Sequence, residues 1–142
     1  MLCENKLEKI RQNNLRVTDL LESIIDIFGK QSHPLTILEL KTLLKKKNFS
    51  PNKTTLYRQV EKLSSIGILQ ESVFSDSQRR YCIVEEGDHH HHFYCKQCGH
   101  AEELPHSLCE KIHKVETQLK SRNFKIIKHS LEIEGLCAKC NS

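Results

Sequence analysis

The chain has 142 residues, of which 37% are hydrophobic and only 6% aromatic, and its formal net charge is +4. That length suits one ordinary domain or two small ones with modest cores. The sequence has no apolar run long enough to span a membrane and no secretory signal. We therefore expect a cytoplasmic protein, with no membrane partner, whose cysteines stay reduced.

The positive charge lies in the first half of the chain. Residues 1–80 carry 14 Lys and Arg against 9 Asp and Glu, whereas residues 81–142 carry 8 against 9. A basic half favours an anionic partner, and nucleic acid is the usual one. A solvated basic surface without a partner is the alternative, because charge alone does not distinguish the two.

The first predicted helix runs from Thr18. Apolar residues recur at helical spacing from Leu20 to Phe28, as expected of an amphipathic helix that packs one face on a core. Gly29 is placed to end this helix in the left-handed conformation.

A helix-turn-helix is predicted next. Thr36 and Glu39 form a capping box at the start of the second helix. Ser50 is the expected N-cap of the third helix, with Pro51 in its first turn. Two helices joined by a short turn are typical of a DNA reader. The apolar stripes of these two helices are Leu40, Leu43 and Leu44, and Leu56, Val60 and Leu63.

The third helix presents a polar face opposite its apolar stripe. Thr and Tyr can contact thymine methyls and phosphates, and Arg can bind a phosphate or a guanine edge. Two strands, 68–74 and 79–84, are expected around a polar turn and would form the wing of a winged helix. The exposed face consists of Lys53, Thr54, Thr55, Tyr57, Arg58 and Gln59.

The remaining residues predict a second, smaller domain. Residues 85–88 are polar and acidic and are the predicted hinge between domains at 1–84 and 89–142. The fold class is α+β: a winged helix-turn-helix domain and a small α/β domain whose sheet edge favours dimerisation. The elements expected in the second domain are strands at 89–94 and 101–104, a helix at 107–122 and a strand at 124–133.

Two CxxC pairs predict a zinc site. Cys95 and Cys98 form the first pair, and Cys137 and Cys140 form the second. Each pair offers two thiolates across one tight turn, so the two pairs together supply four tetrahedral ligands for Zn(II). Two disulfides or a redox CxxC are the alternatives.

Four consecutive histidines precede the first CxxC pair. In a strand, His89 and His91 would face one way and His90 and His92 the other, so one strand could serve two metal sites. A solvated histidine loop is the alternative. Mixed ligand sets here suit zinc, iron(II) or manganese. Further ligand types nearby are Cys82, Glu102, Glu103, His106, Cys109, Glu110, His113 and His129.

Enzyme motifs are absent from the sequence. It has no HExxH, no GxSxG and no H-x-E with P-C-x-x-C. We therefore expect neither an enzyme nor a small-molecule substrate. A metal-storage protein would explain the ligands but not the basic helix-turn-helix half.

The order of these features resembles the ferric uptake regulator (Fur) family of metal-responsive repressors. The specific matches are TTLYR at 54–58, HHHHFYCKQCG at 89–99, HSL at 129–131 and GLC at 135–137. The resemblance implies a homodimer that binds an A·T-rich palindromic operator on double-stranded DNA when its regulatory metal is bound.

The resemblance also implies roles for single residues. The structural zinc ligands are Cys95, Cys98, Cys137 and Cys140. The regulatory ligands are Cys82, His90, His92 and Glu103, with His33 as an addition. The ligands of a third site are His89, His91, Glu110 and His129. The DNA contacts are Tyr57 and Arg58, with Thr54 and Thr55 on the same helix and Arg16 in the minor groove.

Cys82 favours zinc as the regulatory metal. Iron and peroxide sensors of the family typically have Glu or Asp at this position, and a thiolate shifts the preference toward zinc, as in zinc uptake regulators. Gln70 departs from that pattern, because some zinc regulators have a ligand there. A small buried cysteine, an iron(II) or peroxide sensor with Fe(II) or Mn(II) at the non-cysteine ligands, and a zinc-thiol redox switch stay as alternatives.

Overall fold

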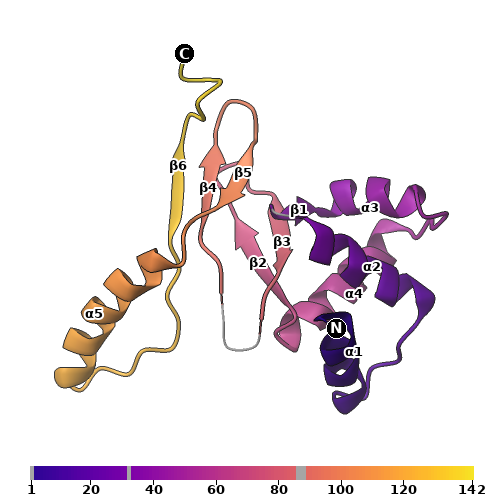
Figure 1. Cartoon of the computed structure of the whole chain (residues 1–142), viewed down its shortest axis with the longest axis horizontal. Coiled ribbons are helices and arrows are strands. Elements are labelled where there is room, and N and C mark those ends of the chain that lie inside the picture. Colours follow the sequence, from indigo (N-terminus) through magenta and orange to yellow (C-terminus); the bar gives the residue numbers. More distant parts are fainter. Residues whose placement is uncertain (1, 32, 86–88) are drawn as a thin grey trace. The chain divides into compact units, whose positions relative to one another are not determined.

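The computed structural model describes residues 2–31, 33–85 and 89–142. The chain divides into two compact units, residues 1–89 and 90–142. The first contains α1 (Leu2–Gln12), α2 (Asp19–Lys30), β1 (Leu35–Thr36), α3 (Ile37–Lys45), α4 (Lys53–Ser65), β2 (Leu69–Val73) and β3 (Arg79–Ile83). The second contains β4 (His92–Cys95), β5 (Ala101–Glu103), α5 (Ser107–Ser121) and β6 (Glu132–Gly135), all labelled in Figure 1.

One hydrophobic core holds the first unit together. Ile24 of α2, Leu40 of α3 and Leu56 of α4 are completely buried, and Tyr81 of β3 is 1% exposed among them. Burying a side chain of this size stabilises a fold by roughly 1.5–3 kcal/mol. The apolar stripes predicted for the three helices are therefore the faces that build the core.

The ends of α2 and α4 differ from the predictions. Thr18 caps α2, which the sequence did not predict. Gly29 lies inside the helix and the chain leaves through extended backbone at Gln31, so the predicted left-handed cap is wrong. The N-cap of α4 is Asn52, whose Oδ1 accepts the N–H of Thr55 at 2.8 Å, so the prediction of Ser50 is also wrong. An asparagine placed three residues before a free N–H satisfies a helix donor well.

The capping box of α3 is confirmed. The Thr36 hydroxyl accepts the N–H of Glu39 at 3.2 Å, and the Glu39 carboxylate accepts the N–H of Thr36 at 2.8 Å. Two donors at the helix start are thus satisfied reciprocally. The cap fixes α3 at the end of β1, a two-residue strand that the sequence did not predict.

The wing is an antiparallel hairpin of β2 and β3, as predicted, and the sheet order is β1-β3-β2. Asp76 in the turn binds the Arg80 guanidinium through both carboxylate oxygens, at 3.1 and 2.8 Å. Arg80 is 7% exposed and also lies over the Phe74 ring. Arg80 therefore stabilises the turn and is too buried to contact DNA. The Arg79 side chain, by contrast, is 53% exposed.

Helix α1 was not predicted, and it contacts the end of the first unit. Lys6, whose side chain is 8% exposed, donates to Glu85 at 3.1 Å across 79 positions of sequence. Glu85 is the first residue of the predicted hinge. Residues 86–88 of that hinge lie outside the described residues.

The second unit has a three-stranded sheet in the order β5-β4-β6. Strand β4 pairs antiparallel with β5 and parallel with β6, which places His92 opposite both Glu103 and Glu132. The predicted strand at 124–133 is wrong for most of its length, because only residues from Glu132 onward join the ladder. The strand predicted at 89–94 likewise begins only at His92.

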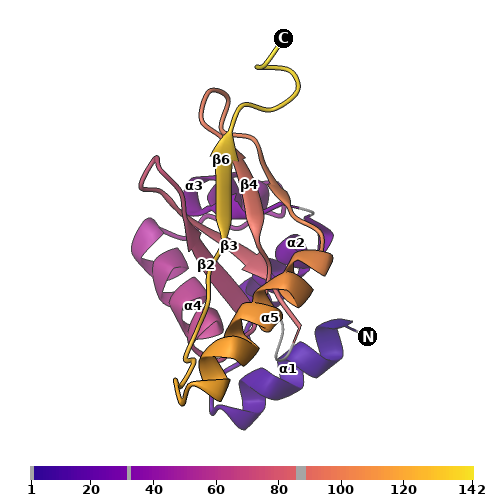
Figure 2. The same cartoon turned by 90° about the vertical axis from the view of Figure 1, so that its left-hand side faces the viewer.

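Helix α5 buries none of its residues. In Figures 1 and 2 it lies beyond the ends of the strands rather than across a face of the sheet. Its predicted stripe therefore remains accessible, and Val115 is 56% exposed. Within the described part of this unit, the buried hydrophobic residues are Tyr94, Cys95 and Ala101.

Candidate metal centres and nucleic-acid interface

The two CxxC pairs lie together in the second unit. All four sulfur atoms lie within 4.8 Å of one another, and Sγ of Cys98 is 3.7 Å from Sγ of Cys137. The turn after β4 supplies the first pair, and the parallel pairing of β4 with β6 brings the C-terminal pair beside it. The donor set fits a tetrahedral zinc ion. All four cysteines are free thiols, so disulfides are not formed here.

The four sulfurs differ in how readily they ionise. Backbone N–H groups of Cys98 and Cys137 lower the pKa of the Cys95 thiol to about 6. Hydrogen bonding to Cys137 and burial raise the pKa of Cys140 to about 12. Cys95 is therefore largely a thiolate near pH 7 before any metal binds. A zinc ion would have to displace the proton of Cys140 as it binds.

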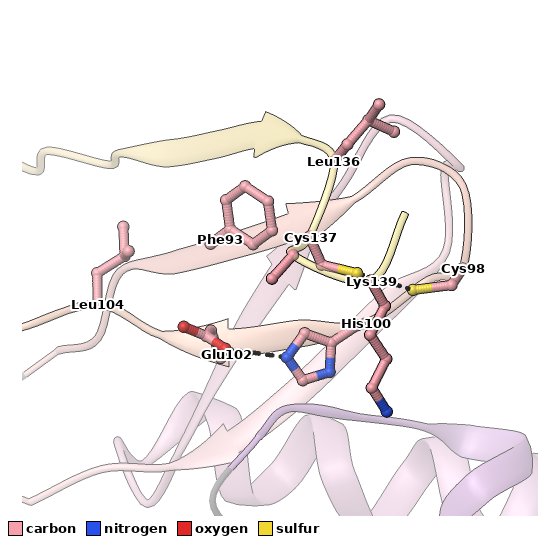
Figure 3. A pocket seen from close by; sticks show the side chains of 9 residues that line it. Phe93, Cys98, His100, Glu102, Leu104, Leu136, Cys137 and Lys139 are labelled. Carbon is pink, nitrogen blue, oxygen red and sulfur yellow. Dashed lines mark hydrogen bonds and ion pairs between the residues drawn. The ribbon is translucent and has the colours of Figure 1, made fainter. Parts of the chain in front are cut away.

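A pocket lies beside this cluster (Figure 3). Phe93, Leu104 and Leu136 form its apolar wall, and Nε2 of His100 lies 2.9 Å from Glu102 on its polar side. The His100 and Glu102 side chains are both more than half exposed. His100 is thus bound to its neighbour on the strand and belongs to none of the ligand clusters in the described residues.

A second cluster joins His90, Glu103 and His106. Nδ1 of His90 lies 3.6 Å from one Glu103 oxygen, and Nε2 of His106 lies 3.8 Å from the other. The three ligand atoms lie within 4.8 Å of one another. Two imidazoles and one carboxylate suit zinc, iron(II) or manganese. The sequence singled out His106 as a ligand type without giving it a site.

His92 occupies a different environment. It is 1% exposed, and burial, followed by the charges of His90 and His91, lowers its pKa to about 4. The imidazole is therefore neutral near pH 7, as a metal ligand must be. The carboxylate of Glu132 faces it from β6, and burial raises the pKa of Glu132 to about 7.

The regulatory ligands predicted in the first unit lie on two elements. Cys82 is in β3, 8% exposed, and its ladder partner is Gln70 of β2. His33 is exposed, between α2 and β1. Because His90, His92 and Glu103 belong to the second unit, their joint site with Cys82 and His33 stays a prediction.

A third cluster joins His91, Cys109 and His129 in the second unit. His91 and His129 are stacked with ring centroids 5.2 Å apart. Glu110 is exposed and is not among the clustered residues of the described chain. His89 is the last residue of the first unit, so its part in this site, like that of Glu110, stays a prediction.

Two glutamates beside the histidines were not predicted. Glu116 binds Nδ1 of His129 at 2.5 Å and Nδ1 of His113 at 3.2 Å. Burial works to raise the pKa of Glu116, but the two histidines outweigh it and hold the pKa below its ordinary value. Helical spacing could have linked Glu116 to His113 and Cys109, whereas Glu132 meets His92 only through a parallel pairing that the sequence does not reveal.

The surface of α4 suits nucleic acid. Thr54, Tyr57 and Arg58 are exposed and Thr55 is half-buried, opposite the buried stripe of the same helix. Arg16 is exposed between α1 and α2. The helix therefore offers hydroxyl, phenol and guanidinium groups on one face.

Comparison with known proteins shows which family has this architecture. The sequence model of the Ferric uptake regulator family matches residues 12–134. The ferric uptake regulation protein of Bacillus subtilis is 27% identical over 97% of this chain and 96% of its own. The chain belongs to the ferric uptake regulator family.

Solved structures agree on the fold. The Helicobacter pylori ferric uptake regulator superposes with a TM-score of 0.81 and 23% identity, over 99% of this chain and 94% of its own. A zinc uptake regulator complexed with zinc and DNA superposes with a TM-score of 0.67 and 22% identity, over 99% and 93%. At these identities the likeness shows the fold alone.

Membership of the family defines the class of protein. The chain is a metal-dependent, DNA-binding transcription regulator and not an enzyme. Among the described residues, no helix has the length and apolar character needed to cross a membrane.

Proposed function

We propose that the protein is a zinc-sensing repressor that binds an A·T-rich palindromic operator as a metal-loaded homodimer. The observation that carries the zinc assignment is Cys82, a buried cysteine on β3 that is in no disulfide. Iron and peroxide sensors of the family typically have a carboxylate at this position. Thiolate and imidazole together favour zinc over harder cations. Zinc sufficiency would then shut off uptake genes.

The proposed regulatory ligands come from both units. His90, His92 and Glu103 are held in the second unit, and Cys82, with His33 as an addition, is in the first. The bound ion would supply positive charge that neutralises the thiolate and carboxylate. Ligands from both units would restrict the hinge between them.

Hinge restriction explains the effect on DNA without a change in any base contact. A dimer reads two half-sites only when its recognition helices match the spacing of the groove. Tyr57 and Arg58 of α4 would contact each half-site, while Arg16 would enter the minor groove. Metal binding would thus raise operator affinity by reducing the cost of orienting the two helices.

An iron(II) or peroxide sensor is the second candidate. The His90, Glu103 and His106 cluster favours it, because two imidazoles and a carboxylate suit iron(II) and need no thiolate. In that case Cys82 is a small buried core residue. A zinc-thiol redox switch is a third reading, in which mild oxidation would release zinc from the CxxC pairs.

Operator binding under buffered metal separates these candidates. Purified protein is titrated onto a labelled A·T-rich palindrome while free Zn(II) and, anaerobically, free Fe(II) are each held at fixed levels. Zinc sensing predicts tight binding at far lower free zinc than free iron, and loss of the zinc response in Cys82→Ser. An iron response that Cys82→Ser leaves unchanged would assign the protein to the iron-sensing branch.

A further inference from the structure

Helix α5 has no fully buried residue to fix it in the second unit. Its apolar residues Leu108, Ile112 and Leu119 are half-buried, and Val115 is exposed. The contacts that reach it from the segment before β6 involve His129, which lies against Glu116. A second bond from the same glutamate goes to His113, within α5 itself. The polar contacts of α5 therefore come from side chains of the types that can bind a metal.

Three of these side chains converge on one point. The ligand atoms of His91, Cys109 and His129 lie within 4.8 Å of one another, from the segment before β4, from α5 and from the segment before β6. His91 is 4% exposed, and Cys109 and His129 are half-buried. A site at this point would connect three separate segments of the second unit.

The hydrogen bond to Glu116 engages one ring nitrogen of His129. Because Nδ1 of His129 lies 2.5 Å from Glu116, a metal ion would be bound through Nε2. Metal-binding histidines commonly pair their other nitrogen with a carboxylate, which fixes the ring and raises its basicity. Cys109, His113 and Glu116 are spaced four and three residues apart, so they share one face of α5.

We propose that Cys109, and not Glu110, is the ligand that α5 gives to this site, and that Glu116 is the positioning residue for His129. The site then binds zinc through a thiolate and two imidazoles and ties α5 to the sheet. This differs from the set implied by family resemblance, in which the helix offers the Glu110 carboxylate. The inference rests on metal binding by the second unit and not on zinc sensing through Cys82.

The ligand types determine which ion the site prefers. One thiolate with two imidazoles suits Zn(II) and its spectroscopic substitute Co(II), whereas a carboxylate in place of the thiolate would suit Fe(II) or Mn(II) equally. The site should therefore fill with zinc in a mixture that contains iron(II). Filling it should also order α5, because the ion would add a link between this helix and the segments that carry His91 and His129.

Cobalt absorption tests the ligand assignment directly. The full-length Cys82→Ser protein, with zinc retained in the four-cysteine cluster, is titrated anaerobically with Co(II), and zinc content is measured in the same samples. We expect a near-ultraviolet band from thiolate-to-cobalt charge transfer. The band should disappear in Cys82→Ser with Cys109→Ser and should persist in Cys82→Ser with Glu110→Gln. A band that survives Cys109→Ser, or no band in the parent, would overturn the proposal.

The positioning role has its own test. Glu116→Gln should keep the charge-transfer band but weaken Co(II) and Zn(II) binding at this site by about 10- to 100-fold, the usual effect of losing such a partner. His113→Gln, which removes the other imidazole on the same carboxylate, should stay within about threefold of the parent. The ¹⁵N signals of His129 should show a changed tautomer only in Glu116→Gln. Equal affinities in the two variants would contradict the role of Glu116. Because no DNA is used and Cys82 is absent, these results are independent of zinc sensing.

Discussion

Glu132 and His92 face each other across the parallel pair of β4 and β6, with a carboxylate oxygen of Glu132 3.9 Å from Nδ1 of His92. That oxygen is buried and has no hydrogen-bond partner within the described part of the chain. A carboxylate with one buried oxygen that lacks a partner is costly when ionised. The pair therefore makes the metal-free second unit sensitive to pH.

Replacing Glu132 should remove an alkaline loss of stability. The pKa of Glu132 is raised from 4.5 to about 7 in the folded state. Its contribution is therefore complete below the unfolded pKa and is lost as the pH rises through the folded pKa. With the regulatory metal removed, Glu132→Gln should be more stable than the parent at pH 8 by about 1–3 kcal/mol and equal to it at acid pH.

Thermal unfolding between about pH 4 and pH 8 measures this difference. Glu134→Gln is the control, since Glu134 is exposed two residues further along β6. His92 has a lowered pKa, so its contribution to the free energy of unfolding should follow the opposite trend. That contribution should be lost as the pH falls from 6.5 to about 4. A Glu132→Gln curve parallel to that of the parent would rule out a raised pKa.

The four-cysteine cluster should be necessary for the fold of the second unit. Few hydrophobic residues are buried there, and Tyr94 and Ala101 are among them. Cys137→Ser should lose one zinc per chain and the structure of this unit, while the first unit keeps its own unfolding transition. Zinc content and hydrogen exchange resolved by unit would measure both effects. Lys139→Ala, in the same C-terminal turn, should retain zinc and fold normally.

Asn52 should stabilise the recognition helix, because its side chain caps α4. Asn52→Ala should reduce the stability of the first unit by about 1 kcal/mol. Ser50→Ala is the matched control and should change stability by less than about 0.5 kcal/mol. Urea unfolding monitored by helix content compares the two. A larger effect for Ser50 would restore it as the cap.

Arg58 should contribute directly to operator binding. It is exposed on α4 beside Tyr57, opposite the buried stripe. Arg58→Ala should weaken binding of metal-loaded protein by about 10- to 100-fold, corresponding to the loss of one base or phosphate contact. Lys62→Ala, in the last turn of the same helix, should have a much smaller effect. Fluorescence anisotropy at fixed salt checks both, and equal losses would indicate only a general charge effect.

Local patterns predicted much of this fold correctly. The apolar stripes around Leu40 and Leu56, the Thr36 capping box and the wing hairpin depend on residues close in sequence, and all are present. The N-cap of α4 was misassigned because Ser50 and Asn52 are both good caps, and only the path of the turn selects between them. Helix α1 was missed, because its apolar positions are sparse.

Long-range pairing limited the prediction of the site residues. The CxxC spacing was sufficient to anticipate that Cys95 and Cys137 meet. Helix α5 offers Cys109 and Glu110 side by side, however, and only the direction of the helix relative to His129 decides which one reaches the cluster. Glu132 could not be predicted as a neighbour of His92, because an antiparallel or shifted pairing would have separated them.

We propose that metal binding by the second unit controls DNA binding by the first. The most direct measurement is the operator affinity of one protein sample, with zinc in its four-cysteine cluster, before and after its regulatory ligands are filled. His90→Ala provides the control. We predict that filling raises the affinity of the parent at least about tenfold, the scale of an ordinary allosteric coupling, and leaves His90→Ala unchanged. Equal affinities of the filled and unfilled parent would contradict the account.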